Sequence, residues 1–194
     1  MNDVAKHYDL LIDEGQDPVH DPKILQDYMD KWDGEVFIGR LKLDKSKSVL
    51  EIGVGTGRIA VKVAPLCGKF TGIDISEKIV QKAKENLKNA DLICGDFLEY
   101  NFDESFDVVY SSLTFLHIEN KQKAFDAVFK ILNEKGLFVL SVDKNQEEYI
   151  DTGISKIRTF PDKSDNIKLH AKKAGLTLIE ETQTELAHIF VYSK

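Results

Sequence analysis

The chain has 194 residues, of which 42% are hydrophobic and 30% are charged, and its formal net charge is −7 at pH 7. This length suits one domain with a sizeable core and argues against two independent domains. The negative charge disfavours a dedicated nucleic-acid binder, which needs a concentrated basic face, and no apolar run approaches the roughly 20 residues that span a bilayer.

Cysteine and metal-ligand patterns limit the chemistry further. Cys67 and Cys94 are the only cysteines in the sequence, and we expect both to be reduced, small core residues. No group of Cys, His and carboxylate residues has the spacing of metal ligands, so we expect no metal. Polar residues follow Met1, which predicts no secretory signal and a cytoplasmic protein.

Two helical segments are predicted before the first strand. Residues 1–20 contain a short apolar group and suit a short helix. A second helix is predicted to start with Asp21 as its N-cap and Pro22 at the first helical position. Its apolar residues recur at helical spacing, at Ile24, Leu25, Tyr28, Met29 and Trp32. We expect Trp32 to lie in the core.

A strand that runs into a glycine-rich turn and then into a helix is the central feature of the chain. Residues 49–52 suit a strand that is buried on both faces. Three glycines then allow a sharp bend and a close approach to a ligand, at Gly53, Gly55 and Gly57. Residues 59–64 predict a helix whose free N–H groups face the turn. The dinucleotide fingerprint requires glycine where Arg58 stands, which disfavours a nicotinamide-dependent dehydrogenase.

Strands and helices alternate after this turn. Strands are predicted over residues 70–74 and 106–112, in a segment that ends at Cys94, and in a segment that includes 137–140. Helices are predicted over residues 77–87, 121–132 and 164–174, and the last of them ends at Gly175. A final hairpin is predicted over residues 176–181 and 186–192. Short connections imply parallel strands with a ligand site at their C-terminal edge. Residues 143–164 break the alternation, either as an excursion that faces a substrate or as a surface connection.

The glycine-rich turn resembles the first motif of class I S-adenosylmethionine-dependent methyltransferases, because it reads E-I-G-x-G-x-G over residues 51–57. The resemblance continues in order through Asp74 and Cys94-Gly95-Asp96-Phe97 to the fourth and fifth strands, over residues 45–143. It implies an α/β fold with a doubly wound, mostly parallel seven-stranded sheet, helices on both faces and an antiparallel last strand. Residues 1–44 would form a small helical cap within the same domain as residues 45–194.

The resemblance also implies a cofactor, S-adenosyl-L-methionine, and a set of residues that would bind it. In that reading Glu51 attracts the cofactor's ammonium, Asp74 accepts hydrogen bonds from the ribose hydroxyls and Asp96 meets the adenine amino group. The candidate cofactor-binding residues are Glu51, Gly53, Gly55, Gly57, Asp74, Ile75, Ile79, Asp96, Phe97 and Ser111. Two alternatives stay open, because Asp96 could instead cap a turn and Ile79 could be ordinary core.

The candidate catalytic residue is His117, just beyond the fourth strand, where an imidazole could act as a base near neutral pH. Tyr8 is a candidate for a substrate-facing or lid position. Arg58 could lie near the methionine carboxylate of the cofactor.

The function that follows is transfer of a methyl group from S-adenosylmethionine to a small-molecule acceptor. The alternative is a non-catalytic cofactor-binding subunit that supports a partner protein. The sequence leaves the acceptor and the oligomeric state open.

Overall fold

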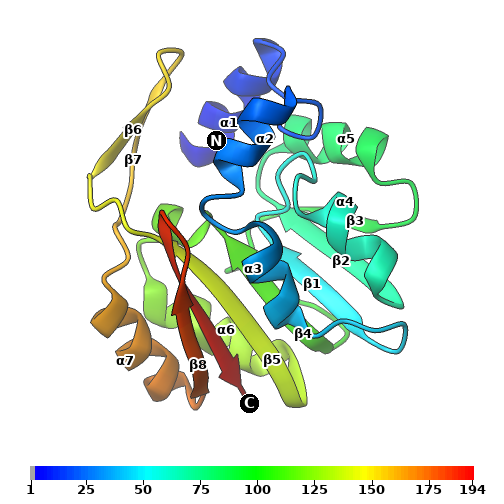
Figure 1. Cartoon of the computed structure of the whole chain (residues 1–194), viewed down its shortest axis with the longest axis vertical. Helices are drawn as coiled ribbons and strands as arrows, with labels where there is room; N and C mark the ends of the chain where they lie inside the picture. The colour runs from blue at the N-terminus through cyan, green and yellow to red at the C-terminus, as the bar shows by residue number, and fades with distance from the viewer. Residues whose placement is uncertain (1–2) are drawn as a thin grey trace.

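The computed structural model describes residues 3–194, and within them the main sheet has seven strands in the order β3-β2-β1-β4-β5-β9-β8 (Figure 1). The strands are β1 (Ser48–Ile52), β2 (Lys69–Asp74), β3 (Asp91–Cys94), β4 (Phe106–Ser112), β5 (Leu132–Asp143), β8 (Thr177–Gln183) and β9 (Ala187–Ser193). The first five are parallel, and β9 runs antiparallel to both of its neighbours. The predicted fold class is confirmed.

Helices surround this sheet. They are α1 (Asp3–Asp13), α2 (Lys23–Met29), α3 (Gly34–Ile38), α4 (Ala60–Val63), α5 (Glu77–Asn86), α6 (Lys121–Ile131) and α7 (Ser164–Ala174), with 3-10 turns η1 (Gly39–Leu41), η2 (Ala64–Leu66) and η3 (Phe115–His117). Local chemistry sets several helix ends. The Ser76 side chain accepts a hydrogen bond from the Ile79 amide and caps α5, and Gly175 ends α7 in the left-handed conformation with φ of 97°.

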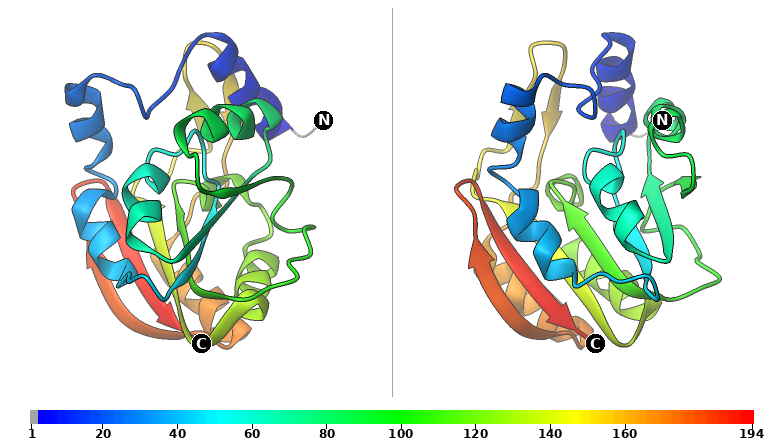
Figure 2. Two further views of the ribbon diagram at one scale, coloured as in Figure 1. Left: turned by 90° about the vertical axis from the view of Figure 1, so that its right-hand side faces the viewer. Right: turned by 45° about the vertical axis from the view of Figure 1, so that its right-hand side comes forward.

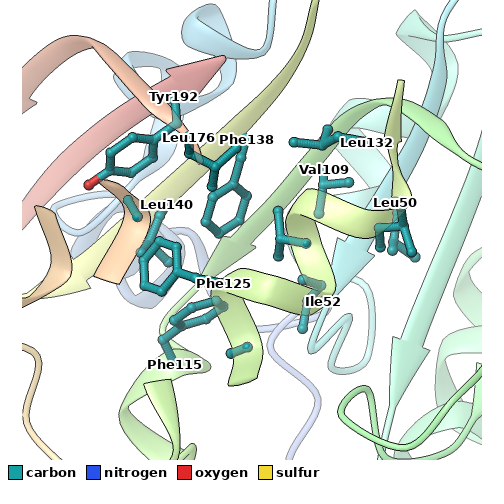
Figure 3. Close-up of a cluster of buried hydrophobic side chains, with 14 of the residues drawn as sticks. Leu50, Ile52, Val109, Phe115, Phe125, Leu132, Phe138, Leu140, Leu176 and Tyr192 are labelled. Carbon is teal, nitrogen blue, oxygen red and sulfur yellow. The ribbon is translucent and has the colours of Figure 1, made fainter. Parts of the chain in front are cut away.

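Both faces of the sheet are buried, as expected for parallel strands. Alternate residues of β1 point to opposite sides, so Leu50 and Ile52 join the core under α6 and α7, whereas Val49 joins the core under α3 and α4. Figure 3 shows the first of these cores, in which Phe125 of α6 lies against strand residues such as Phe138. The central strands are therefore fixed from two sides, and their C-terminal ends are held in place.

The second helix differs from its prediction. It begins at Lys23, with Pro22 as its N-cap, and none of its residues is buried. Ile24 is 77% exposed, and Trp32 is only partly buried rather than part of the core. The reason is position: α2 lies above the end of the sheet (Figures 1 and 2), so its apolar stripe has no sheet face to cover.

One smaller expectation was also wrong. Cys94 is exposed, because β3 is the edge strand of the sheet and its end is not covered, whereas Cys67 is buried as expected. The helix predicted over residues 59–64 is present as α4, and its last residue begins the 3-10 turn η2, because Pro65 has no amide hydrogen to continue the α-helical pattern.

The excursion between β5 and α7 is a β-hairpin formed by β6 (Tyr149–Asp151) and β7 (Lys156–Arg158). Its base is closed by Thr159, whose hydroxyl donates to the Glu147 carbonyl at 2.7 Å. Helix α1 packs against β7 and α5. Figures 1 and 2 show α1, α2 and the hairpin beyond the same end of the sheet, where they cover the C-terminal ends of the parallel strands.

Among helices of residues 3–194, none combines the length and the apolar character that a membrane span requires. The same residues contain no group of three or more His, Cys, Asp or Glu side chains arranged to hold a metal ion.

Candidate functional site

A cavity of about 950 Å³ lies at the C-terminal ends of β1, β2 and β4 and is covered by α1 and β7. These strand ends flank the point where the strand order reverses, which is where open α/β sheets bind their ligands. The cavity has a floor made by the glycine-rich turn and a wall made by the loop that follows β4. It is the natural candidate for the functional site.

The three glycines of the turn have different tasks. All have positive φ, and Gly53 and Gly55 line the cavity. A Cβ on Gly53 would lie 2.0 Å from Thr114 Oγ1, so no larger residue fits, whereas a Cβ on Gly55 would meet no atom within 4 Å. Gly57 does not line the cavity; a Cβ there would press on Leu87 at 3.0 Å. Gly57 therefore serves packing, while the other two shape the floor.

Asp74 lies at the end of β2, opposite the turn. Its carboxylate accepts a hydrogen bond from the Gly55 amide at 3.0 Å and another from the Ser76 amide at 3.1 Å. Burial raises the pKa of Asp74, and these backbone hydrogen bonds oppose that shift. The following residue, Ile75, also lines the cavity. The arrangement joins the ends of two adjacent strands through one carboxylate.

Glu51 is a buried carboxyl group at the cavity floor, only 3% exposed. The Tyr110 hydroxyl donates to it at 2.7 Å from the adjacent strand. Burial raises the pKa of Glu51 to about 8, although the Tyr110 hydrogen bond and the nearby Arg58 charge lower it. Glu51 therefore holds a proton near neutral pH unless a further cation, besides Arg58, binds beside it.

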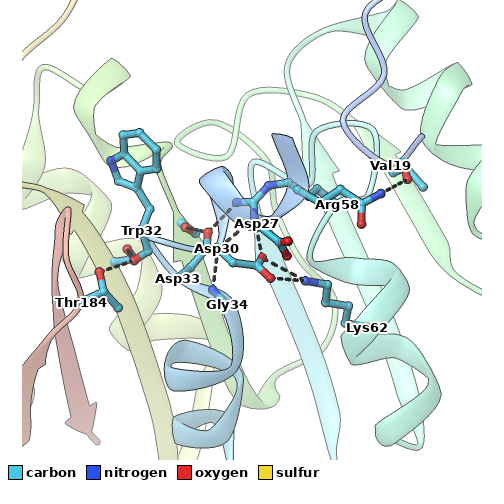
Figure 4. Close-up of polar contacts among 12 residues, drawn as sticks. Val19, Asp27, Asp30, Trp32, Asp33, Gly34, Arg58, Lys62 and Thr184 are labelled. Atoms are coloured by element: carbon cyan, nitrogen blue, oxygen red, sulfur yellow. Dashed lines mark hydrogen bonds and ion pairs between the residues drawn. The ribbon is translucent and has the colours of Figure 1, made fainter. Parts of the chain in front are cut away.

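Arg58 is paired with Asp33, a residue that the sequence patterns did not single out. The guanidinium donates two hydrogen bonds to the Asp33 carboxylate, at 2.8 and 2.5 Å (Figure 4). The Ser112 hydroxyl and the Gly34 amide also donate to this carboxylate, each at 2.7 Å. Burial favours a raised pKa for Asp33, but the Arg58 charge and the hydrogen bonds from Arg58, Ser112 and Gly34 together outweigh it and lower the pKa.

Asp96 and Phe97 line the cavity beyond the end of β3. Asp96 Oδ1 accepts a hydrogen bond from the Leu98 amide at 2.9 Å, so this carboxylate caps a turn while it faces the cavity. Both readings of Asp96 are therefore compatible with its position.

His117 and Tyr8 meet at the other end of the cavity, which both residues line. The Tyr8 hydroxyl and His117 Nε2 lie 2.7 Å apart. Burial lowers the pKa of His117 to about 4, and the positive charges of His7, when that imidazole is protonated, and of Lys121 lower it further. Next to this pair, His7 Nδ1 lies 2.5 Å from the Ser155 hydroxyl of the hairpin, and burial lowers the pKa of His7 as well. Both imidazoles are thus neutral at neutral pH.

The cavity brings together most of the candidate residues, with two exceptions besides Gly57. Ile79 is buried in α5 and does not line the cavity. Ser111 is buried in β4, where its hydroxyl donates to the Ile52 carbonyl at 3.0 Å. Ile157 and Phe160 line the cavity from the segment 143–164, which the sequence offered either as a substrate-facing excursion or as a surface connection. Met29 also lines the cavity, although the sequence did not single it out as a site residue, because no local pattern relates α2 to the strand ends.

Comparison with known proteins identifies the domain. Residues 50–140 match the family model described as a methyltransferase domain. An uncharacterized methyltransferase of Staphylococcus carnosus is 31% identical over 140 residues, which cover 71% of this chain and 61% of that protein. The chain spans only 41%, 43% and 36% of three further curated proteins that are named as methyltransferases.

Two solved structures share the fold. The Haloferax volcanii methyltransferase in a complex with the Trm112 activator has a TM-score of 0.76 at 18% identity, over 96% of each chain. The N-methyltransferase NodS of Bradyrhizobium japonicum, in complex with S-adenosyl-L-homocysteine, has a TM-score of 0.63 at 21% identity, over 77% of this chain and 79% of that one.

Proposed function

We propose that the chain is a class I S-adenosylmethionine-dependent methyltransferase, which its match to a methyltransferase-domain model over residues 50–140 supports, and that it binds S-adenosylmethionine in the cavity and transfers the methyl group to a small-molecule acceptor. The observation that carries the proposal is the contact between Asp74 and the Gly55 amide, which places a carboxylate and the glycine-rich turn at one cavity floor. That pairing suits a ligand that has hydroxyl groups for the carboxylate and an extended part that can lie close to the backbone of the glycine-rich turn.

The residues present fit this cofactor. Gly55 leaves open space where a side chain would stand, so the backbone can be approached closely. Asp74 would accept hydrogen bonds from the ribose hydroxyls, and Asp96 from the adenine amino group. Glu51 would attract the cofactor's ammonium, since a cation beside this buried carboxyl group favours its ionised form. Arg58, although paired with Asp33, keeps further N–H groups near the methionine end.

Few catalytic side chains are needed. When bound, S-adenosylmethionine supplies a methyl group that is already electrophilic because it is attached to a sulfonium. The protein therefore has to hold the acceptor in line with that methyl group and exclude water. Helix α1 and the β6–β7 hairpin cover the cavity and are suited to both tasks. A small-molecule acceptor is favoured because a cavity of about 950 Å³ is within the range of small-molecule sites, roughly 300 to 1,000 Å³.

Two measurements test the proposal. Isothermal titration with S-adenosylhomocysteine should show saturable binding at one site, whereas NAD⁺ should not bind. If S-adenosylhomocysteine fails to bind to the folded protein, the proposal is wrong. Transfer of a labelled methyl group from S-adenosylmethionine should then be screened against phenols, amines, thiols and carboxylic acids. Turnover by the isolated chain separates the enzyme from a non-catalytic subunit that supports a partner.

A further inference from the structure

We infer that the methyl acceptor carries an oxyanion group, a carboxylate or a phosphate, and that the Arg158 side chain binds this group. The contact would lie at the hairpin end of the cavity, which is the part lined by Lys156, Arg158 and Phe160. This inference rests on the proposed function and names the chemical class of its acceptor. In this assignment Arg158 selects the acceptor and takes no part in the methyl transfer itself.

Arg158 differs from the other arginines because it has no carboxylate partner. The sequence contains three arginines. Arg40 lies 3.0 Å from a carboxylate oxygen of Glu180, and Arg58 is bound to Asp33. Among residues 3–194, no carboxylate oxygen lies within 4.0 Å of the Arg158 guanidinium. Since the chain has a net charge of −7, carboxylates are abundant, and this guanidinium nevertheless keeps its hydrogen-bond donors free.

Two hydrogen bonds fix Phe160, and with it Arg158, beside the turn η3. The Phe160 amide donates to the Leu116 carbonyl at 2.7 Å, and Lys121 Nζ donates to the Phe160 carbonyl at 2.9 Å. The guanidinium carbon of Arg158 lies 5.3 Å from the centroid of the Phe160 ring. Because Leu116 directly precedes His117, the guanidinium lies at the same end of the cavity as the candidate catalytic residue.

Lys156 is a second cation of the hairpin that lines the cavity. It precedes Arg158 by two residues in β7, so both side chains leave the same face of the strand. Asp151 lies directly opposite Lys156 in β6, but its carboxylate accepts a hydrogen bond from the Gly153 amide at 2.9 Å. The Lys156 ammonium instead lies over the Tyr149 ring, 4.8 Å from its centroid. Two cations without an ion-pair partner in the described chain therefore share this face.

The carboxyl groups that line the cavity do not cancel this charge. Three belong to the strand ends, where the cofactor would bind: Glu51, Asp74 and Asp96. The other two are Asp3 and Glu119. Asp3 lies 3.6 Å from Lys6, which balances its charge, whereas Glu119 forms no ion pair within residues 3–194. Lys156 and Arg158 together outweigh Glu119, so the unpaired charges away from the strand ends sum to a positive value.

The chemistry of a guanidinium suits an oxyanion. Its planar fork can donate two parallel hydrogen bonds to a carboxylate or a phosphate. The Phe160 ring below the guanidinium restricts its rotation through a cation–π contact and leaves the N–H groups at its edge available. Phe160 and Ile118 also give the cavity apolar surface. An acceptor with an apolar body and one oxyanion fits both features.

Probe binding tests the inference without knowledge of the natural acceptor. Saturating S-adenosylhomocysteine keeps the probes out of the cofactor's part of the cavity. Under this condition 3-phenylpropanoate should bind about three- to tenfold more tightly than the neutral 3-phenylpropanamide, an effect between that of an exposed ion pair and that of a buried one. The cation 3-phenylpropylammonium should bind more weakly than the amide.

A phosphate probe, 3-phenylpropyl phosphate, identifies the oxyanion. Tighter binding of the phosphate than of the carboxylate assigns a phosphate to the acceptor, and weaker binding assigns a carboxylate. The inference is overturned if neither anion binds more tightly than the amide, if the ammonium probe binds most tightly, or if no probe shows saturable binding.

Variants assign the preference to Arg158. Arg158→Gln should remove most of the preference for the anion, and Arg158→Lys, which keeps the charge without the fork, should keep part of it. Lys163→Gln removes one positive charge from an exposed residue outside the cavity and should keep the preference. Glu119→Gln should strengthen anion binding by about twofold, because it removes the opposing charge. A preference of full size in Arg158→Gln refutes the assignment.

Two controls separate this inference from the proposed function. Raising the salt concentration from about 50 to about 500 mM should reduce the anion preference, because the exposed charges of the hairpin are screened. S-adenosylhomocysteine affinity is measured for every variant and should match that of the wild type. If the wild type does not bind S-adenosylhomocysteine, the proposed function fails; if it binds that ligand but shows no anion preference, this inference alone fails.

Discussion

Arg58 and Asp33 form a two-point ion pair that joins the end of the glycine-rich turn, just before α4, to the segment before the first strand. The Arg58 side chain is 16% exposed and the Asp33 side chain is fully buried. Asp33 also caps α3 through the Gly34 amide. The pair therefore connects the N-terminal cap to the cavity floor, although 25 residues separate the two partners in sequence.

Asp33→Asn should destabilise the protein strongly, because it leaves the Arg58 charge buried without its partner. Breaking a buried ion pair in this way costs about 3 to 5 kcal/mol. Urea unfolding measures the change, and Asp165→Asn is a matched control because the Asp165 side chain is 96% exposed and should change stability by less than about 1 kcal/mol. Equal stability of the two variants would mean that the ion pair adds nothing to folding.

Asp74→Ala should weaken S-adenosylhomocysteine binding by about 3 kcal/mol, roughly a hundredfold, because two ribose hydroxyls lose a charged acceptor. The fold should survive, although the Gly55 and Ser76 amides lose a hydrogen-bond acceptor. Calorimetric titration measures the affinity, with Asp91→Ala on the exposed end of β3 as the control. Unchanged affinity in a folded Asp74→Ala variant would remove this residue from the site.

Ligand binding should release a proton from Glu51. Its pKa of about 8 means that the group is mostly protonated at pH 7, and the ammonium of S-adenosylhomocysteine should lower that pKa. Titrations at pH 7 in buffers of different ionisation enthalpy should show release of close to one proton, and Glu51→Gln should show none. Buffer-independent enthalpies in the wild type would contradict the prediction.

The same group makes stability depend on pH. The folded pKa of Glu51 lies above its ordinary value of 4.5, so the folded state holds the proton more tightly than the unfolded state. Its contribution to stability is fully present below about pH 4.5 and is lost as the pH rises toward 8. Denaturant titrations across this window should therefore show a steeper loss of stability in the wild type than in Glu51→Gln.

Deletion of residues 1–20 should reduce methyl transfer more than it reduces stability. Helix α1 covers the cavity through Tyr8 and is attached to the body by polar contacts, such as Asp9 with Ser76 at 2.5 Å and Asp13 with Lys78 at 2.6 Å. Its loss should admit water to the site while the sheet remains. Thermal melts, S-adenosylhomocysteine affinity and turnover of a chain that begins at Asp21 distinguish the outcomes: a lost melting transition would show that α1 completes the core instead.

Features that depend on residues adjacent in sequence could be predicted from the sequence. The cap at Ser76, the end of α7 at Gly175 and the bend at Gly53 all follow from local backbone chemistry. Features that depend on strand order could not. Cys94 has the surroundings of a buried strand in sequence, but β3 is at the edge of the sheet, and this order is set by tertiary pairing.

The residues of the candidate site divide in the same way, into those that local sequence predicts and those that depend on tertiary contacts. Asp74 was predictable because a carboxylate at a buried strand end needs a partner. Asp33 was not, because its partner Arg58 lies in another element and neither residue belongs to a spacing pattern. For the segment 143–164 the sequence left two alternatives open, a substrate-facing excursion and a surface connection, because a three-residue strand gives too short a pattern to orient Ile157 toward the cavity.

The closed base of the β6–β7 hairpin has an evolutionary consequence. Since Thr159 fastens the outgoing strand to Glu147, the chain leaves the body and returns to it at adjacent points. Insertions or replacements at the tip therefore need not shift the register of β5 or α7. Under the proposed function, acceptor specificity can change in evolution by replacement of this one segment. The glycine-rich turn and Asp74, by contrast, would bind the cofactor, which stays the same among related proteins.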